Sequence, residues 1–159
     1  MTTRTTATVG LLAALLTTCG LASAEAHAIG GGLRTPRARA ARSLKATDTA
    51  HLRYIKHTGS LLFEEGTAHG TLPGNMLAYC NVGGTFTASF TIYTSGGTIK
   101  GHGTATPHGE GIYESFAGTL TVTGGSGRYA HAHGHAGLYG TFNRRTYAMV
   151  VQTTGSLSY

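Results

Sequence analysis

The sequence has 159 residues, among them 25 glycines, 12 lysines and arginines, six acidic residues and only two cysteines, and its formal net charge is +6. This length indicates one domain rather than several, and two cysteines exclude a small fold held together by several disulfides. No Walker loop, Rossmann unit, paired CxxC or HExxH pattern occurs, so the common nucleotide-binding and metalloprotease motifs are absent.

The first part of the chain has the order of an export signal. Arg4 precedes an apolar run from Val9 to Leu16, and small residues follow it. A positive charge, an apolar stretch and an Ala-x-Ala site in this order are typical of a secretory signal peptide. Cleavage after Ala24 or after Ala28 fits the pattern, and we assign residues 1–28 to the signal and expect a secreted bacterial protein. The apolar run is shorter than the ~20 residues that a membrane-spanning helix needs, so we predict no transmembrane segment.

The two cysteines have different expected roles. Lipoprotein signals carry a small residue directly before the cysteine, whereas Thr18 precedes Cys19, so we do not expect lipid anchoring there. Removal of the signal leaves Cys80 without an intramolecular disulfide partner. We interpret Cys80 as a small buried hydrophobic residue, with a reactive or intermolecular thiol as the alternative.

Residues 29–50 are predicted to be a flexible basic linker. This segment contains a triple glycine, Pro36 and several arginines, and it has few large apolar side chains. Such a composition cannot offset the entropy lost on ordering the chain. Basic clusters attract anionic partners, and for an exported chain an anionic envelope polymer is a nearer partner than nucleic acid. We therefore expect a solvated linker, with an envelope polymer as the alternative partner and no specific nucleic acid.

From His51 onward the pattern changes to period two. In the segment from Thr85 to Tyr93, apolar residues alternate with threonine and serine, which predicts a strand with one buried face. The buried face would comprise Phe86, Ala88, Phe90 and Ile92. Two more segments alternate in the same way, at 116–123 with Phe116, Leu120 and Val122 inward, and at 147–157 with Tyr147, Met149, Val151 and Leu157 inward. Weaker strands are predicted at 60–72, 76–82, 97–106 and 129–142.

Turn signals separate these strands. Proline and glycine clusters at 73–75, 95–97, 107–109 and 124–127 favour tight reversals. Several short strands at near-regular spacing indicate an all-β sandwich or barrel. Glycines within the strands, such as Gly101, suit bulges and bends in a closed sheet, and closure removes exposed edges. We therefore predict that residues 51–159 form a small antiparallel β-barrel of seven or eight strands, with a sandwich as the alternative.

The glycine turn before the predicted strand at 129–142 carries a resemblance to a known family. Residues 124–130 read GGSGRYA, and Gly134 follows. This segment resembles the GGTGRF/Y segment of dirigent and allene oxide cyclase-like barrel proteins, which also occurs in small secreted bacterial proteins. The resemblance covers roughly residues 59–159, and the glycine segment is its distinctive part.

The resemblance implies a barrel that works through a shaped cavity. Dirigent proteins hold phenoxy radicals so that coupling is stereoselective, and allene oxide cyclases fold an unstable epoxide in an apolar barrel and steer its cyclisation. The related plant barrels assemble as trimers, so an oligomer is possible. Barrels of about eight strands are either filled by side chains or hold one small ligand.

Arg128, Tyr129 and Tyr147 are the candidate ligand-binding residues. Arg128 has two predicted roles, an ion pair with Glu110 or Glu114 or contact with an anion. Tyr129 is expected to pack into the barrel with its hydroxyl group at the rim.

His131, His133 and His135 are the candidate metal ligands. At alternate positions on one strand they would share a face, with neighbours about 6–7 Å apart, and imidazole suits Zn²⁺ or Cu²⁺. The alternatives are a solvent-facing row without specific metal affinity and a patch that titrates near neutral pH. We otherwise expect no cofactor.

The sequence offers no complete catalytic constellation. Glu64 and Glu65 are adjacent on a predicted strand and should point to opposite faces, so they do not form the paired carboxylates of a glycosidase. The leading prediction is therefore a secreted, non-enzymatic barrel that binds a small apolar or aromatic ligand or an envelope component. Two alternatives stay open, a cyclase- or isomerase-like barrel with a cavity of a few hundred Å³, and a histidine-rich metal-binding or structural surface protein.

Overall fold

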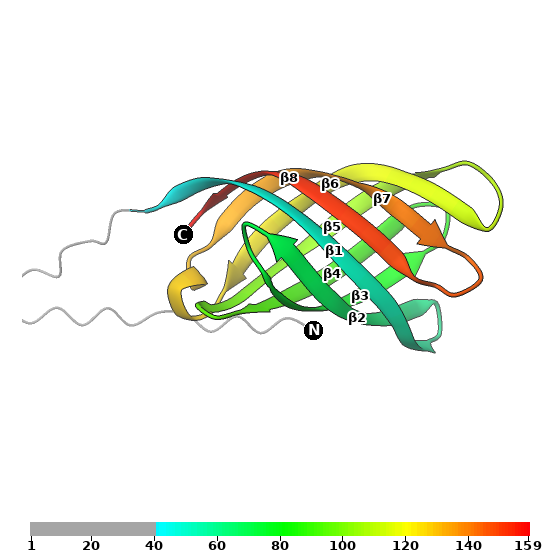
Figure 1. Cartoon of the computed structure of the whole chain (residues 1–159), viewed down its shortest axis with the longest axis horizontal. Coiled ribbons are helices and arrows are strands. Elements are labelled where there is room, and N and C mark those ends of the chain that lie inside the picture. Colours follow the sequence, from blue (N-terminus) through cyan, green and yellow to red (C-terminus); the bar gives the residue numbers. More distant parts are fainter. Residues whose placement is uncertain (1–40) are drawn as a thin grey trace, which may run out of the picture. The chain divides into compact units, whose positions relative to one another are not determined.

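The computed structural model describes residues 41–159 as eight antiparallel strands that close into a barrel, with neighbours in chain order and β1 paired with β8 (Figure 1). The elements are β1 (Ser43–Thr58), β2 (Leu61–Gly70), β3 (Gly74–Val82), β4 (Phe86–Thr94), β5 (Gly97–His108), β6 (Tyr113–Gly125), the single-turn 3₁₀ helix η1 (Gly127–Tyr129), β7 (His133–Asn143) and β8 (Met149–Ser158). The prediction of a small antiparallel barrel is confirmed. The predicted signal peptide and most of the predicted linker lie outside the described residues. The described part of the chain has no helix that is long and apolar enough to cross a membrane.

Alternating side chains build the core as the sequence predicts. On β4, Phe86 and Phe90 are buried while Thr87 and Ser89 are exposed. The same alternation buries the inward residues of β6 and β8, among them Phe116, Val122, Met149 and Leu157. Because successive side chains of a strand point to opposite faces, one apolar face on each strand is sufficient to fill a closed barrel.

The first strand begins earlier than predicted. Residues 43–50 were assigned to the flexible linker, but they belong to β1, which pairs with β8 from Ser43↔Ser158 to Leu52↔Met149. The linker boundary at residue 50 is therefore wrong. After Leu44, the early half of β1 turns small or polar residues such as Ala46 and Asp48 inward, so it carries fewer large apolar residues than the other strands.

The last strand begins later than predicted. Tyr147 was expected to face inward at the start of this strand, but it lies in the loop between β7 and β8, with a positive φ of 58° and 41% of its surface exposed. The loop is closed by backbone hydrogen bonds from Tyr147 N to Asn143 O (2.7 Å) and from Asn143 N to Ala148 O (2.9 Å). The strand therefore begins at Met149, and the predicted inward positions of Met149 and Leu157 are confirmed.

Two glycines lie under phenylalanine rings inside the barrel. A Cβ atom on Gly101 would lie 2.7 Å from the Phe90 ring, and one on Gly140 would lie 2.6 Å from the Phe116 ring. The pairing of β5 with β6 also shifts register between Lys100 and Gly101, which confirms the predicted bulge. Glycine at these positions provides the space that the aromatic core occupies.

The barrel has two rims, the terminal rim and the opposite rim. The terminal rim contains the start of β1, the end of β8 and η1, and Figure 1 shows the C-terminus there. The opposite rim contains the turns between β1 and β2, β3 and β4, β5 and β6, and β7 and β8. Antiparallel order places alternate connections at alternate ends.

Candidate functional site

The barrel interior contains one carboxyl group that is fully removed from solvent. Glu64 on β2 has 0% exposure, whereas its neighbour Glu65 points outward and forms an ion pair with Arg53. The prediction that the two glutamates face opposite sides is confirmed. The inward position of Glu64 follows from the alternation of β2, in which Leu62 and Ala68 are also buried.

Glu64 has almost no polar neighbours. Among residues 41–159 its Oε1 atom has no hydrogen-bond partner, and its Oε2 atom lies 4.0 Å from the Cys80 thiol, which is a weak donor. The two side chains meet because β2 and β3 pair with Glu64 opposite Ala78 and Leu62 opposite Cys80. Burial disfavours the charged carboxylate and raises the pKa of Glu64 to about 7. Glu64 is thus an acid that titrates near neutral pH in an apolar interior.

Cys80 is the second chemical group of this site. It is a free, buried cysteine. Burial, and secondly the negative charge of Glu64, raises the pKa of the thiol to about 12. A thiol that stays protonated is a poor nucleophile, so the interpretation of Cys80 as a buried hydrophobic residue is confirmed.

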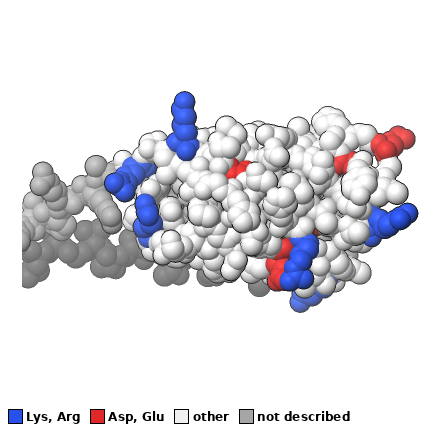
Figure 2. Space-filling model, in the orientation of Figure 1, with Lys and Arg blue, Asp and Glu red and all other residues white. Residues whose placement is uncertain are grey.

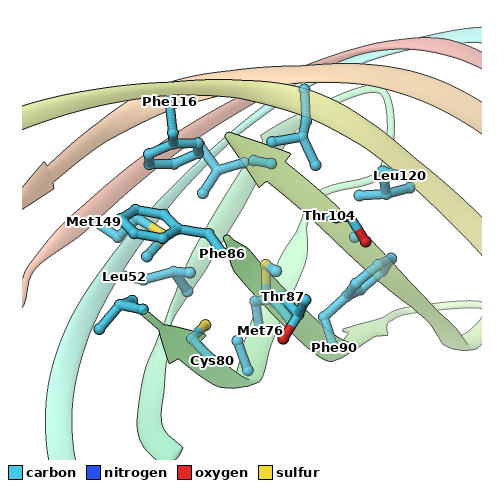
Figure 3. Close-up of a pocket in the computed structure, with 17 residues that line it drawn as sticks. Leu52, Met76, Cys80, Phe86, Thr87, Phe90, Thr104, Phe116, Leu120 and Met149 are labelled. Atoms are coloured by element: carbon cyan, nitrogen blue, oxygen red, sulfur yellow. The ribbon is translucent and has the colours of Figure 1, made fainter. Parts of the chain in front are cut away.

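An apolar cavity of about 60 Å³ lies beside this pair. Figure 3 shows side chains from several strands converging on it, with Met76 and Cys80 of β3 across from Phe116 of β6. Cys80 and Ala78 both line the cavity, and Glu64 is the cross-strand partner of Ala78. Glu64 does not itself line the cavity; it adjoins Ala78 and Cys80, which do.

A second interior cavity of about 70 Å³ lies on the side of Asp48 and Ile99. It shares four lining residues with the first cavity, which are Met76, Phe90, Leu120 and Val151. Asp48 is buried and accepts a hydrogen bond from Leu72 N at 2.6 Å. Burial raises the pKa of Asp48, and the backbone hydrogen bonds from Leu72 and Thr71 partly oppose this. Asp48 thus has polar partners, whereas Glu64 lacks them.

Both cavities are small. A drug-sized ligand occupies a pocket of roughly 300–1,000 Å³, and one water molecule takes about 30 Å³ in the liquid. The alternative of a cyclase- or isomerase-like barrel predicts a cavity of a few hundred Å³. The interior cavities of 60 and 70 Å³ are smaller than that. Any interior ligand must be small or must displace the side chains between the two cavities.

The three predicted ligand-binding residues do not form one site. Arg128 and Tyr129 belong to η1 at the terminal rim, whereas Tyr147 lies in the β7–β8 loop at the opposite rim. Tyr129 is buried, as predicted. The predicted ion pair of Arg128 with Glu110 or Glu114 is wrong, because the ion pairs within residues 41–159 are Arg53–Glu65 and Arg144–Glu114. Arg128 instead donates a hydrogen bond from Nη2 to the Tyr159 hydroxyl at 2.9 Å.

The three histidines do not share one strand. His131 lies in the turn before β7, whereas His133 and His135 are on β7 and exposed. His133 Nδ1 bonds the carbonyl of His131 (3.0 Å), and His135 Nδ1 lies 3.2 Å from the Thr121 hydroxyl. Within residues 41–159, no group of three or more His, Cys, Asp or Glu side chains is arranged to hold a metal ion. The predicted alternation of all three histidines along one strand is thus wrong at His131.

Sequence analysis missed the Glu64–Cys80 pair. The alternation of the second strand, with Leu62 two residues before Glu64, is a signal that places Glu64 inward. No signal in the sequence indicates that β3 brings Cys80 next to it, because that contact depends on strand register.

Comparison with known proteins adds no relative to this picture. No protein-family model, no curated protein and no solved structure matches the chain. The proposals below therefore rest on the sequence and on the geometry of the barrel.

Proposed function

We propose that this protein is an exported barrel whose interior binds one small, mainly apolar or aromatic molecule that carries a hydrogen-bonding group. The observation that carries this proposal is the Glu64 carboxyl, which has 0% exposure and an Oε1 atom without a hydrogen-bond partner in the described part of the chain. A buried polar atom without a partner costs roughly 1–3 kcal/mol. A ligand hydroxyl or amide group that reached Oε1 would remove this cost.

The side chains between the two cavities set the size of the ligand. Met76 lines both cavities, and methionine adapts to irregular spaces because it is unbranched and has three rotatable bonds. Rotation of Met76 would join the cavities beside Cys80. An apolar cavity of about 150 Å³ is known to take up benzene, so we propose a ligand of about one aromatic ring.

Sequence features support the exported location and the use of the interior. The order of Arg4, the apolar run 9–16 and the small residues after it favours secretion. The resemblance of residues 124–130 to dirigent and allene oxide cyclase-like barrels favours a role that depends on the barrel interior.

Calorimetric titration of the full chain with phenol and with toluene tests the proposal. The two ligands are similar in size, and only phenol has a group that can bond to Glu64. We expect phenol to bind the wild-type chain with at least about tenfold preference over toluene, since one buried hydrogen bond to a carboxyl group is worth that much. Glu64→Leu should abolish or reverse the preference.

Two further variants make this test specific. Glu65→Leu changes the outward neighbour of Glu64 and should leave the preference intact. Met76→Ala enlarges both cavities and should strengthen the binding of both ligands. Absence of any binding to the wild-type chain and to Met76→Ala would refute an interior ligand site.

The titration behaviour of Glu64 favours a second candidate function, proton transfer in a cyclase- or isomerase-like barrel. General acid–base groups work best when their pKa lies near the operating pH, and burial places the pKa of Glu64 at about 7. Exchange of the α-protons of cyclohexanone in D₂O, followed by NMR, tests this role. Catalysed exchange that is lost in Glu64→Gln would support it, and equal exchange in both chains would exclude it.

A further inference from the structure

A separate hollow of about 390 Å³ lies at the terminal rim. Its wall includes Arg42, Arg128, His131, His133 and Tyr159. It shares none of its lining residues with the two interior cavities. This hollow is therefore a site of its own, and it is several times larger than either interior cavity.

The barrel holds the positive groups of this hollow in place. Arg42 and Tyr159 form a backbone pair, with Arg42 N donating to Tyr159 O at 2.7 Å and Tyr159 N donating to Arg42 O at 2.8 Å. The Arg128 guanidinium lies over the rings of Tyr129 and Tyr159, at 5.3 and 5.1 Å from their centroids. Its backbone N–H is fixed by Gly96 O at 2.9 Å. Arg128 is thus oriented before any ligand arrives.

No Asp or Glu side chain of residues 41–159 forms an ion pair with these groups. The ion pairs within residues 41–159 are Arg53–Glu65 and Arg144–Glu114, and neither involves Arg42 or Arg128. No acidic residue lines the hollow. On the face shown in Figure 2, lysine and arginine side chains lie at both ends of the barrel, and those at the end away from the start of β1 have acidic side chains beside them.

The donors that remain match an oxyanion. Arg128 uses one N–H to reach Tyr159, and a guanidinium has five. His133 Nδ1 donates to the His131 carbonyl, so Nε2 is the ring nitrogen that is left for a ligand. Arginine forks bind phosphoryl oxygens with short, charge-assisted hydrogen bonds. The ring of Tyr159 supplies an apolar wall for the organic part of a ligand.

We propose that this rim hollow binds a phosphoryl group, with the guanidinium of Arg128 as its main contact and Arg42 as the second cation. The volume of 390 Å³ accommodates a phosphorylated molecule of the size of a monosaccharide phosphate. This site is independent of the interior site, and it adds an anionic ligand to a protein whose interior is apolar.

Calorimetric titration of the full chain with glucose 6-phosphate tests the proposal, with glucose as the uncharged control. We expect saturable binding of one glucose 6-phosphate and no binding of glucose. Arg128→Gln and Arg42→Gln should each weaken binding about tenfold, as expected for loss of a charge-assisted contact. We expect Arg42→Gln to fold normally, because Arg42 pairs with Tyr159 through backbone atoms that the substitution leaves unchanged. Weaker binding by this variant would therefore not be due to misfolding.

Arg145→Gln is the matched control for charge. It removes one positive charge from the opposite rim, in the loop between β7 and β8, and should leave the affinity unchanged. Equal weakening by Arg145→Gln and Arg128→Gln would show non-specific attraction to a basic chain and would overturn the proposal. Absence of saturable binding at millimolar concentration would also overturn it.

A vesicle assay distinguishes the source of the phosphoryl group. Sedimentation of the chain with phosphatidylglycerol vesicles, reduced by Arg128→Gln, would assign the site to a lipid headgroup. Binding of glucose 6-phosphate without sedimentation would assign it to a free phosphorylated molecule. Vesicle binding that persists unchanged in Arg128→Gln and Arg42→Gln would contradict a role for this hollow.

Discussion

Glu64 couples the chemistry of the interior to the stability of the fold. Its carboxyl group is fully buried, and burial raises its pKa from an ordinary value of 4.5 to about 7. The carboxyl of the unfolded chain therefore loses its proton at lower pH than that of the folded chain. Between these two pH values the folded chain binds more protons, so a rise in pH favours unfolding.

We expect the free energy of unfolding to fall by about 3 kcal/mol between pH 4.5 and pH 7 because of Glu64 alone, since each pKa unit corresponds to about 1.4 kcal/mol. Urea denaturation at several pH values measures this contribution as the difference between the wild-type chain and Glu64→Gln. The amide cannot ionise, so the variant should lack this part of the decline. Parallel pH profiles for the two chains would show that Glu64 is solvated in solution. Glu65→Gln serves as the control, because its outward position should leave the decline intact.

Cys80 should be chemically silent in the folded chain. Burial and the charge of Glu64 raise the pKa of its thiol to about 12, and alkylation needs the thiolate. We expect iodoacetamide at pH 8 to leave Cys80 unmodified in the native chain and to modify it in guanidinium chloride. Mass spectrometry of the digested chain separates Cys80 from Cys19. Rapid native modification of Cys80 would favour the reactive-thiol alternative.

Within the strands, the packing of phenylalanine rings over glycine residues determines how tightly the core is filled. The aromatic cluster of Phe86, Phe116 and Phe142 has centroid distances of 5.6 Å from Phe86 to each of the other two rings. Gly140 on β7 lies under Phe116, and a Cβ atom there would also lie 2.1 Å from Val150 O. The neighbouring backbone cannot move away from such a contact without disturbing the β7–β8 pairing.

Gly140→Ala should therefore destabilise the barrel by about 1–3 kcal/mol, the usual cost of overpacking. Gly137→Ala is the matched control on the same strand, since the nearest atom to its new Cβ is Thr154 O at 3.9 Å. The control should change stability by less than about 0.5 kcal/mol. Urea denaturation of both variants measures the difference, and equal stabilities would contradict the packing of Phe116 over Gly140.

The elements differ in how much the sequence reveals about them. The alternation of β4 is easy to detect because Phe86 and Phe90 are large and their neighbours are polar. The first half of β1 carries Asp48 at an inward position and resembles a linker, because its place in the barrel depends on pairing with β8 more than 90 residues away. Tyr147 continued the alternation of β8 in the sequence, but the hairpin turn reversed its direction. The local sequence pattern thus predicted the strands that have large inward residues. It failed where long-range strand pairing or a turn determined the strand boundary.

Closure of the barrel is the property of the whole molecule that assembles the rim hollow. The contact of Arg128 with Tyr159 joins the β6–β7 connection to the C-terminal end of the barrel, and Arg42 reaches the same hollow through its pairing with Tyr159. The sequence indicates Arg128 and Tyr129 as candidate ligand-binding residues, but it does not indicate that Tyr159 and Arg42 lie next to them. Which chain ends meet depends on the number of strands and their register, which residue patterns alone do not specify.

A chain that starts at Ala41 should retain the fold, and one that starts at His51 should lose it. The second chain lacks the pairing of residues 43–50 with β8 and leaves the edge of β8 partly unpaired. We expect a single cooperative urea transition for the first chain and a broad, low-stability transition for the second. Dispersed NMR spectra and equal stabilities for both chains would restore the linker boundary at residue 50.

The central claim is that the barrel interior receives a small ligand at Glu64, and the titration of wild-type and Glu64→Leu chains with phenol and toluene tests it most directly. We predict that the wild-type chain binds phenol about tenfold more tightly than toluene and that Glu64→Leu loses this preference. An equal ratio of phenol affinity to toluene affinity in the two chains, or no binding of either ligand, would contradict a ligand site at Glu64. The interior would then be a filled structural core.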